Sequence, residues 1–128
     1  MSVIQDTSTR PYGEVLQALT DCVVACEQLV KSGFSPPSSL LTINRATVLR
    51  WMEWSPMLER NPDLADTWLS LCANTCKAWA EAYRHHPSET AQNCVRASER
   101  CIEVCVRASQ QHESQAKASR EHVSLELS

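Results

Sequence analysis

Apolar residues recur at steps of three and four along most of the chain, which is the spacing of one face of a helix. Near the N-terminus this stripe runs through Val15, Leu19, Cys22, Cys26 and Leu29. The same spacing continues in the range 68–83, and no stretch alternates apolar and polar residues as a half-buried strand would. The pattern therefore predicts an all-α protein.

Helix caps and prolines divide this pattern into four segments. Pro11 suits the first turn of a helix and Gly33 suits the position just past its end. Pro56 is expected to end the second helix, because a residue that precedes proline is pushed out of the helical region. Asn61 is a good N-cap for the third helix, and Pro87 follows its end. The predicted helices span about residues 11–32, 39–55, 62–86 and 88–115.

The connections between these helices are short, and short connections favour antiparallel neighbours. The sequence therefore predicts an antiparallel up-down four-helix bundle with a long C-terminal helix. A chain of 128 residues fits a single domain. After about residue 112 the sequence is polar with little periodicity, so the end of the chain is expected to be either a solvated extension of the fourth helix or a frayed tail.

Charge and hydropathy narrow the functional class. The formal net charge is −3 and basic residues form no stripe, so nucleic-acid binding is not expected. No apolar run approaches the ~18–20 residues that a membrane span needs. The N-terminus lacks the basic and apolar regions of a secretory signal, which makes a cytoplasmic location the expectation. The motifs of common enzyme sites are missing as well, including those of hydrolases, phosphate loops and zinc proteases, so the chain is not expected to be an enzyme.

Seven cysteines are the unusual feature of the composition. Six of them form three pairs with a spacing of four, namely Cys22 and Cys26, Cys72 and Cys76, and Cys101 and Cys105. Residues four apart differ by about 40° around a helix, so each pair lies on the apolar stripe of its helix and faces the core of a bundle. Folding the helices together should bring these six thiols to one depth, with Cys94 nearer the turn between the third and fourth helices.

The spacing and the compartment limit what these thiols can do. An odd number of cysteines in a reducing compartment argues against a disulfide framework. Cβ atoms four residues apart on a helix are separated by ~5–6 Å, whereas a disulfide needs ~3.5–4.5 Å. Soft thiolates select Cu(I) and Zn(II). Cu(I) can be held by two thiolates, whereas Zn(II) prefers four in a tetrahedron and would draw on two pairs.

Two other interpretations of the cysteines stay open. They could be small apolar side chains that fill the core, or they could take part in redox chemistry, although catalytic thiols are usually more exposed. If the cysteines only fill the core, the chain would be a helical interaction module. In that case Trp51 and Trp54, which are three residues apart, could lie at a partner surface, and the helix faces could also support a homo-oligomer.

The cysteines lie in three segments, which are DCVVAC at 21–26, LCANTC at 71–76 and CVRASERCIEVC at 94–105. In these segments the chain resembles the bacterial cysteine-rich four-helix bundles that bind copper, including the copper storage proteins. The resemblance implies that thiolates inside the bundle bind Cu(I) ions, with Zn(II) or no metal as the alternatives. It also implies that His85 and His86 are entry ligands at the open end of the bundle, whereas the residues alone favour partners of a helix C-terminus. The metal-binding residues predicted in this way are Cys22, Cys26, Cys72, Cys76, Cys94, Cys101, Cys105, His85 and His86.

The chain departs from the pattern of that family in two places. Family members commonly carry further cysteines where Trp79 and Tyr83 follow Cys76 here, and the second predicted helix has no cysteine. The sequence therefore resembles a member with a reduced set of thiols, and a site for a few ions is expected rather than a store of high capacity.

Overall fold

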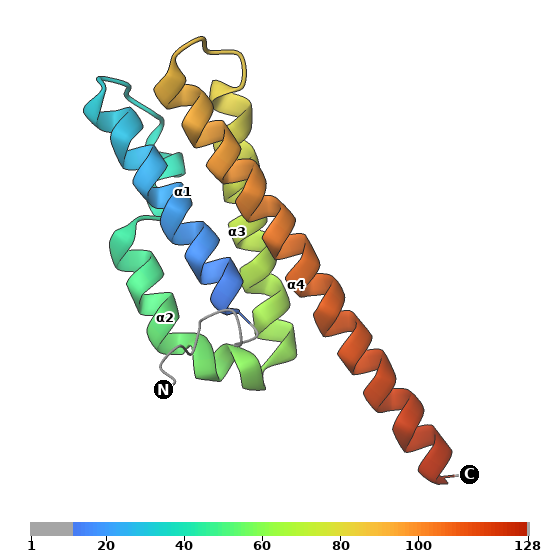
Figure 1. The fold of residues 1–128 in the computed structure, drawn as a ribbon. Helices are drawn as coiled ribbons and strands as arrows, with labels where there is room; N and C mark the ends of the chain where they lie inside the picture. Colours follow the sequence, from blue (N-terminus) through green and yellow to red (C-terminus); the bar gives the residue numbers. More distant parts are fainter. Residues whose placement is uncertain (1–11, 128) are drawn as a thin grey trace, which may run out of the picture.

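The four predicted helices are present and run alternately up and down the bundle (Figure 1), which confirms the all-α, antiparallel four-helix fold. The computed structural model describes the backbone of residues 12–127 and the side chains of residues 12–111. The N-terminal segment 1–11, which includes the predicted start at Pro11, lies outside the described residues. The elements are α1 (Gly13–Lys31), the short 3₁₀ turn η3 (Ser38–Thr42), α2 (Arg45–Arg60), α3 (Pro62–Tyr83) and α4 (Glu89–Leu127).

The end of α1 follows from Gly33, which has a φ of +100° that residues with a side chain rarely adopt. The N–H of Gly33 donates to the carbonyl of Val30, and the N–H of Phe34 donates to the carbonyl of Leu29. These two hydrogen bonds form a Schellman motif, which closes the helix. The motif turns the Phe34 ring onto the end of the bundle, against Tyr83 of α3.

The boundaries predicted for the second helix, 39–55, are wrong at both ends. Residues 38–42 form the turn η3, and α2 begins only after Asn44, whose side chain accepts a hydrogen bond from the N–H of Thr47. At the other end α2 continues through Pro56 to Arg60. Proline removes the hydrogen bond to the carbonyl four residues earlier. Here that residue is Met52, which is exposed like Pro56, so the interrupted hydrogen bond lies on the solvent side of α2.

The cap at Asn44 makes the start of α2 testable. Asn44→Ala is expected to lower the free energy of unfolding by about 1 kcal/mol, because the N–H of Thr47 loses its partner. Asn44→Asp keeps an acceptor oxygen and should retain most of the stability. Urea unfolding of both variants under reducing conditions measures the difference. Equal losses in the two variants would show that the cap does not hold this end of the helix.

The other boundaries differ by smaller amounts. The first and third helices, predicted to span about 11–32 and 62–86, are Gly13–Lys31 and Pro62–Tyr83. The fourth, predicted at 88–115, begins at Glu89 after Ser88, which accepts a hydrogen bond from the N–H of Ala91. It continues to Leu127, so the polar end of the chain is a helical extension that projects beyond the bundle (Figure 1).

The core lies mainly between α1, α3 and α4. All five residues of the predicted α1 stripe are buried. The residues that continue this spacing in α3 are buried as well, namely Trp68, Leu69, Cys72, Cys76, Trp79 and Tyr83. In α2, Trp51 is 7 % exposed and packs edge-to-face on Trp68, whereas Trp54 is 44 % exposed. Only the Trp51 ring therefore belongs to the core, and Trp54 faces the surface.

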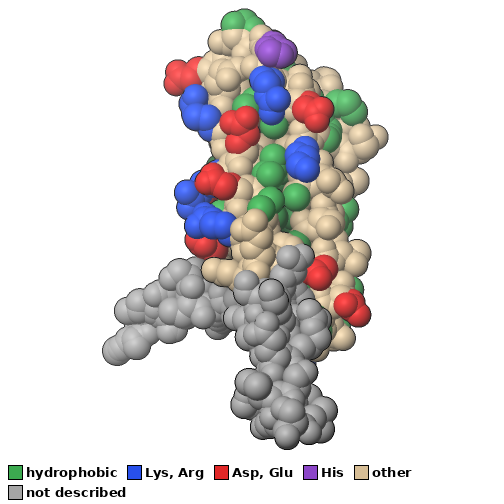
Figure 2. Space-filling view, turned by 90° about the vertical axis from the view of Figure 1, so that its right-hand side faces the viewer, with side chains coloured by type: hydrophobic (Ala, Val, Ile, Leu, Met, Phe, Trp, Pro, Cys, Tyr) green, Lys and Arg blue, Asp and Glu red, His purple; other side chains and the backbone are tan. Residues whose placement is uncertain are grey.

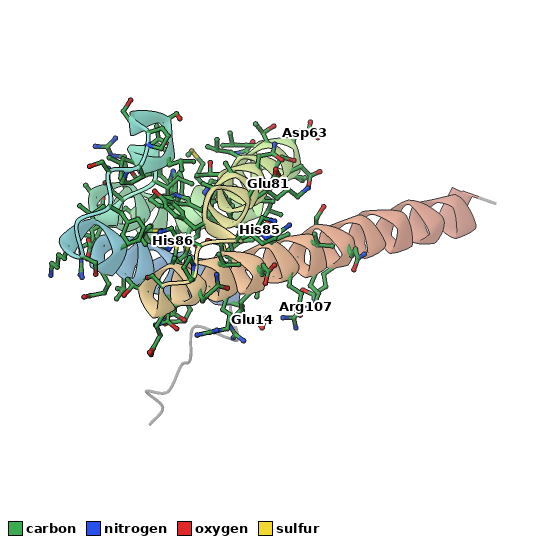
Figure 3. The ribbon with its side chains drawn as sticks, turned by 90° about the horizontal axis from the view of Figure 1, so that it is seen from above. Glu14, Asp63, Glu81, His85, His86 and Arg107 are labelled. Carbon is green, nitrogen blue, oxygen red and sulfur yellow. The ribbon has the colours of Figure 1, made fainter. Side chains whose placement is uncertain are left out.

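Surface charges are mixed in sign. Acidic and basic side chains are interspersed on the face shown in Figure 2. At the lower end of α1, Glu14 and Arg107 of α4 form an ion pair with a separation of 3.9 Å (Figure 3). None of the described helices is both long and apolar enough to cross a membrane.

Candidate metal centre

All seven cysteines are buried and carry free thiols. Two come from α1, two from α3 and three from α4, and α2 contributes none. The helical spacing of four explains this burial, because it keeps both members of each pair on the stripe that faces the core. The predicted convergence of thiols from three helices is thus confirmed, whereas metal binding by these residues stays a prediction.

The seven thiols form one connected series of side-chain interactions that passes between the three helices, here called the thiol chain. Its order is Cys94, Cys26, Cys22, Cys76, Cys101, Cys105 and Cys72. Neighbours along the thiol chain often belong to different helices. The two cysteines of α3 each interact with α4, Cys76 with Cys101 and Cys72 with Cys105. The CxxxC spacing in α3 therefore presents two thiols to a neighbouring helix.

Cys94 belongs to this chain and is not set apart from it. Its sulfur lies 3.6 Å from the sulfur of Cys26 in a hydrogen bond between α4 and α1. Two sulfurs bound to one tetrahedral zinc ion, at Zn–S distances of about 2.3 Å, are about 3.8 Å apart. The separation of Cys26 and Cys94 is thus already close to that of two thiolates that share an ion.

Proton sharing along the chain divides the thiols into two kinds. The pKa values of Cys22, Cys94 and Cys105 are lowered, in each case chiefly by hydrogen bonding to a neighbouring cysteine, while burial opposes the shift. A neighbouring S–H that donates to a thiolate stabilises its charge. The neighbours that keep their protons have raised pKa values, and these are Cys26, Cys72, Cys76 and Cys101. Because neighbouring thiols interact strongly, their protons are lost in steps that belong to the thiol chain and not to single residues.

Ser98 is the member of this centre that sequence patterns alone did not single out. It is fully buried, and its hydroxyl lies 3.4 Å from the sulfur of Cys22. Hydrogen bonding to Ser98 also lowers the pKa of Cys94. Ser98 lies four residues after Cys94 and three before Cys101, so it occupies a place in the cysteine stripe of α4. That register is the signal that could have identified it.

His85 and His86 lie in the turn between α3 and α4 (Figure 3). The His86 ring packs against Phe34 at a centroid distance of 4.7 Å, and its Nδ1 accepts a hydrogen bond from the N–H of Ser88. His85 is exposed. Within residues 12–111, no hydrogen bond joins either ring to a thiol, so the structure does not bring the histidines together with the cysteines.

Aromatic rings separate the thiols from this end of the bundle. Tyr83 stacks on Trp79 with ring centroids 5.9 Å apart, and Phe34 packs edge-to-face on Tyr83. Burial raises the pKa of the Tyr83 hydroxyl, and the charges of Cys94 and Cys26 raise it further, so the tyrosine lies beside these two thiols. A row of packed rings thus leads from His86 through Phe34 to Tyr83, which adjoins the thiol chain.

The side chains described by the structure include no group of three or more His, Cys, Asp or Glu residues arranged around a single point as metal ligands. The thiols instead adjoin one another in succession, each with one or two neighbours. The family model described as copper storage protein matches residues 8–110. The chain belongs to the copper storage protein family. No curated protein and no solved structure matches it.

Membership of the copper storage protein family relates the buried thiols to copper storage. The matched range contains all seven cysteines and Ser98. The family is one of storage proteins, and its description implies that copper is bound. The sequence resemblance to copper-binding bundles is therefore confirmed at the level of the family.

Proposed function

We propose that this protein sequesters Cu(I) through the thiolates of the thiol chain, in a reducing, cytoplasmic setting and without catalysis. The observation that supports this most directly is the unbroken succession of seven buried thiols from three helices. Soft thiolates favour Cu(I), and two of them satisfy it. A succession of adjoining sulfurs offers such pairs at every step, whereas a tetrahedral Zn(II) site needs four sulfurs around one point.

The order of the thiol chain predicts its capacity. If each Cu(I) takes two adjoining sulfurs and shares none, seven thiols hold about three ions and leave one sulfur over. One such arrangement pairs Cys94 with Cys26, Cys22 with Cys76, and Cys101 with Cys105. Loss of either terminal thiol, Cys94 or Cys72, still leaves six thiols in succession, which can form three pairs. Loss of the middle thiol, Cys76, leaves two groups of three, each of which can hold one ion.

Anaerobic titration of the reduced protein with Cu(I) against a competing chelator tests this proposal. The parent is expected to bind about three ions tightly. A serine hydroxyl is a hard oxygen that Cu(I) disfavours, so each substitution removes one ligand. Cys76→Ser should then bind about two ions, and the matched control Cys72→Ser should still bind about three. Circular dichroism confirms that each variant keeps its helices. Equal capacities in the two variants would contradict the proposed order of pairs.

Two other results would replace the proposal. No uptake of Cu(I) by the parent would favour a helical interaction module in which the cysteines only pack. Stoichiometric binding of Zn(II) in preference to Cu(I) would favour a zinc site assembled from two cysteine pairs. His85 and His86 are not needed for the predicted capacity, so His85→Ala and His86→Ala should leave it unchanged.

A further inference from the structure

Cys26 is the most exposed of the seven thiols, at 8 %, while the other six are exposed by 4 % or less. It lies at a surface groove of about 360 Å³ between α1 and the segment that leads to α2. A groove of this volume can hold a small molecule. Its walls are mostly apolar, and Glu27 and Lys31 add one charge of each sign. The apolar residues that line it are Val23, Val30, Leu41, Ile43 and Trp79.

A smaller cavity lies behind the groove. Its volume is about 10 Å³, roughly that of one water-sized sphere. Cys22, Cys26 and Cys76 all line it, and these three thiols are consecutive in the thiol chain. The groove and the cavity have Val23, Cys26, Ile43 and Trp79 in common. Cys26 thus connects the groove to the middle of the thiol chain.

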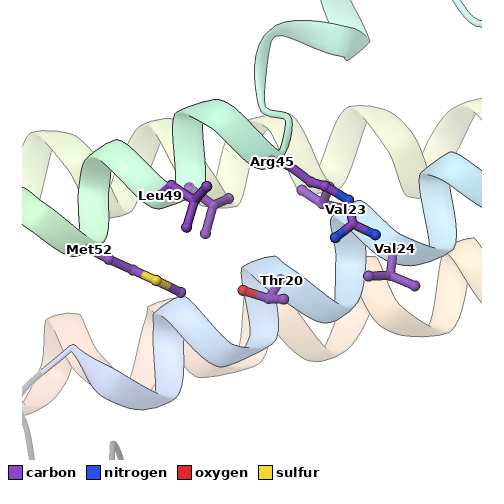
Figure 4. A pocket seen from close by; sticks show the side chains of 7 residues that line it. Thr20, Val23, Val24, Arg45, Leu49 and Met52 are labelled. Atoms are coloured by element: carbon purple, nitrogen blue, oxygen red, sulfur yellow. The ribbon is translucent and has the colours of Figure 1, made fainter.

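The outer wall of the groove is held in place by two contacts. The indole N–H of Trp79 donates to the carbonyl of Leu40 at 2.8 Å, which fixes η3 over α3. Glu27 of α1 forms an ion pair with Arg45 at the start of α2, with a shortest separation of 2.7 Å. On the other side of Arg45 lies a second hollow, of about 130 Å³ between α1 and α2 (Figure 4), and no cysteine lines it. The groove at Cys26 is therefore the one of these two surface hollows that reaches a thiol.

The end of the bundle offers a poorer route. There His86 packs on Phe34, Phe34 packs on Tyr83, and Tyr83 lies beside Cys94 and Cys26. An ion that entered from this end would have to displace two aromatic rings. At the groove, in contrast, Cys26 itself lines the wall and keeps 8 % of its surface exposed.

We propose that the groove is the entrance through which copper reaches the thiol chain, and that Cys26 is the first acceptor. This inference rests on the proposed function. The donor is a small anionic Cu(I)–thiolate complex, whose organic part fits the apolar walls and whose charge is complementary to Lys31. Such an exchange needs no oxidant or reductant.

Two ligand exchanges transfer the ion. In the first, Cys26–SH reacts with [Cu(SR)₂]⁻ to give [Cys26–S–Cu–SR]⁻ and RSH, so the thiol proton leaves with the displaced ligand. In the second, the thiol of Cys94, 3.6 Å from Cys26, displaces the remaining donor ligand. The products are [Cys26–S–Cu–S–Cys94]⁻ and a second RSH. Charge and protons balance in both steps.

Blocking the groove with a larger side chain tests the entrance without removing a ligand. Leu41→Trp should slow loading from a Cu(I)–glutathione complex about tenfold in stopped-flow measurements, which corresponds to ~1.4 kcal/mol added to the barrier. The final capacity should be unchanged. Leu71→Trp is the matched control, because Leu71 is similarly exposed (50 % against 44 %) but does not line the groove. Val30→Trp on the opposite wall provides a second blocking variant should Leu41→Trp fail to fold.

The possible outcomes test the proposed entrance independently of the proposed storage of Cu(I). Full final loading at the parental rate in both blocking variants would overturn the entrance and leave Cu(I) storage standing. Slower loading in His86→Ala, with normal rates in the blocking variants, would assign entry to the end of the bundle. No loading of the parent at equilibrium would overturn both proposals.

Discussion

Saturating Cu(I) is expected to raise the melting temperature of the reduced protein by about 10 °C for each independent site that it fills. A ligand that binds only the folded state, at a hundredfold excess over its dissociation constant, adds ~2.7 kcal/mol per independent site. For a chain of this length each kcal/mol raises the melting temperature by roughly 3–5 °C. Thermal unfolding under anaerobic conditions, followed by circular dichroism at 222 nm, measures the shift. The increase should depend on copper concentration, as mass action requires.

The order of the thiol chain supplies a matched pair of variants for this measurement. The first triple variant replaces every second thiol with serine, through Cys26→Ser, Cys76→Ser and Cys105→Ser. No two of its remaining sulfurs adjoin, so the copper-dependent shift in melting temperature should disappear. Another triple variant loses the same number of thiols but keeps Cys22 beside Cys76 and Cys101 beside Cys105. Its substitutions are Cys94→Ser, Cys26→Ser and Cys72→Ser. Because adjoining pairs remain, this variant should retain a clear copper-dependent shift in melting temperature. A similar shift in both variants would mean that adjoining pairs are not the binding unit.

Trp79→Ala is expected to cause the largest loss of stability of any single change considered, about 3–5 kcal/mol in the metal-free protein. The ring is 2 % exposed and stacks on Tyr83. Its removal leaves a cavity in the core and deprives the Leu40 carbonyl of its hydrogen bond from the indole N–H. Since small proteins are stable by only ~5–15 kcal/mol, this loss is a large part of the total.

Urea unfolding of the metal-free protein measures this loss, with Trp54→Ala as the control. Trp54 belongs to the same residue type but is 44 % exposed, so its replacement should change stability by no more than about 0.5 kcal/mol. Trp79→Phe should fall between the two, because it keeps an aromatic ring but not the N–H. Similar unfolding midpoints for Trp79→Ala and Trp54→Ala would contradict the role assigned to the buried indole.

The fold and the inward direction of the cysteines were predictable because both depend on local periodicity. A spacing of four fixes the direction of Cys22 and Cys26 relative to the other apolar residues of the same helix, whatever surrounds it. The start of α2 was not predicted, because several polar residues before it could serve as caps and only the folded chain shows that Asn44 does. Its continuation through Pro56 was not predicted either, because the exposure of Met52 and Pro56 depends on how α2 packs in the folded chain.

Contacts between helices were harder to predict than directions within one. That Cys76 adjoins Cys101, and Cys72 adjoins Cys105, was expected only as a similarity of height along the bundle. Which thiol touches which depends on the rotation of each helix about its axis, and periodicity alone does not fix that rotation. The groove at Cys26 depends on the path of the segment between α1 and α2, which has no periodic pattern from which it could be predicted.

Copper bound to the thiol chain would cross-link only part of the molecule. Its sulfurs come from α1, α3 and α4, so the metal would tie these three helices to one another and leave α2 without a direct bond to it. Local opening of α2 would then cost nearly the same with and without copper, while opening of the other three would require metal–sulfur bonds to break. A loaded molecule is therefore expected to combine a rigid three-helix body with a second helix that can still detach and exchange its amide protons.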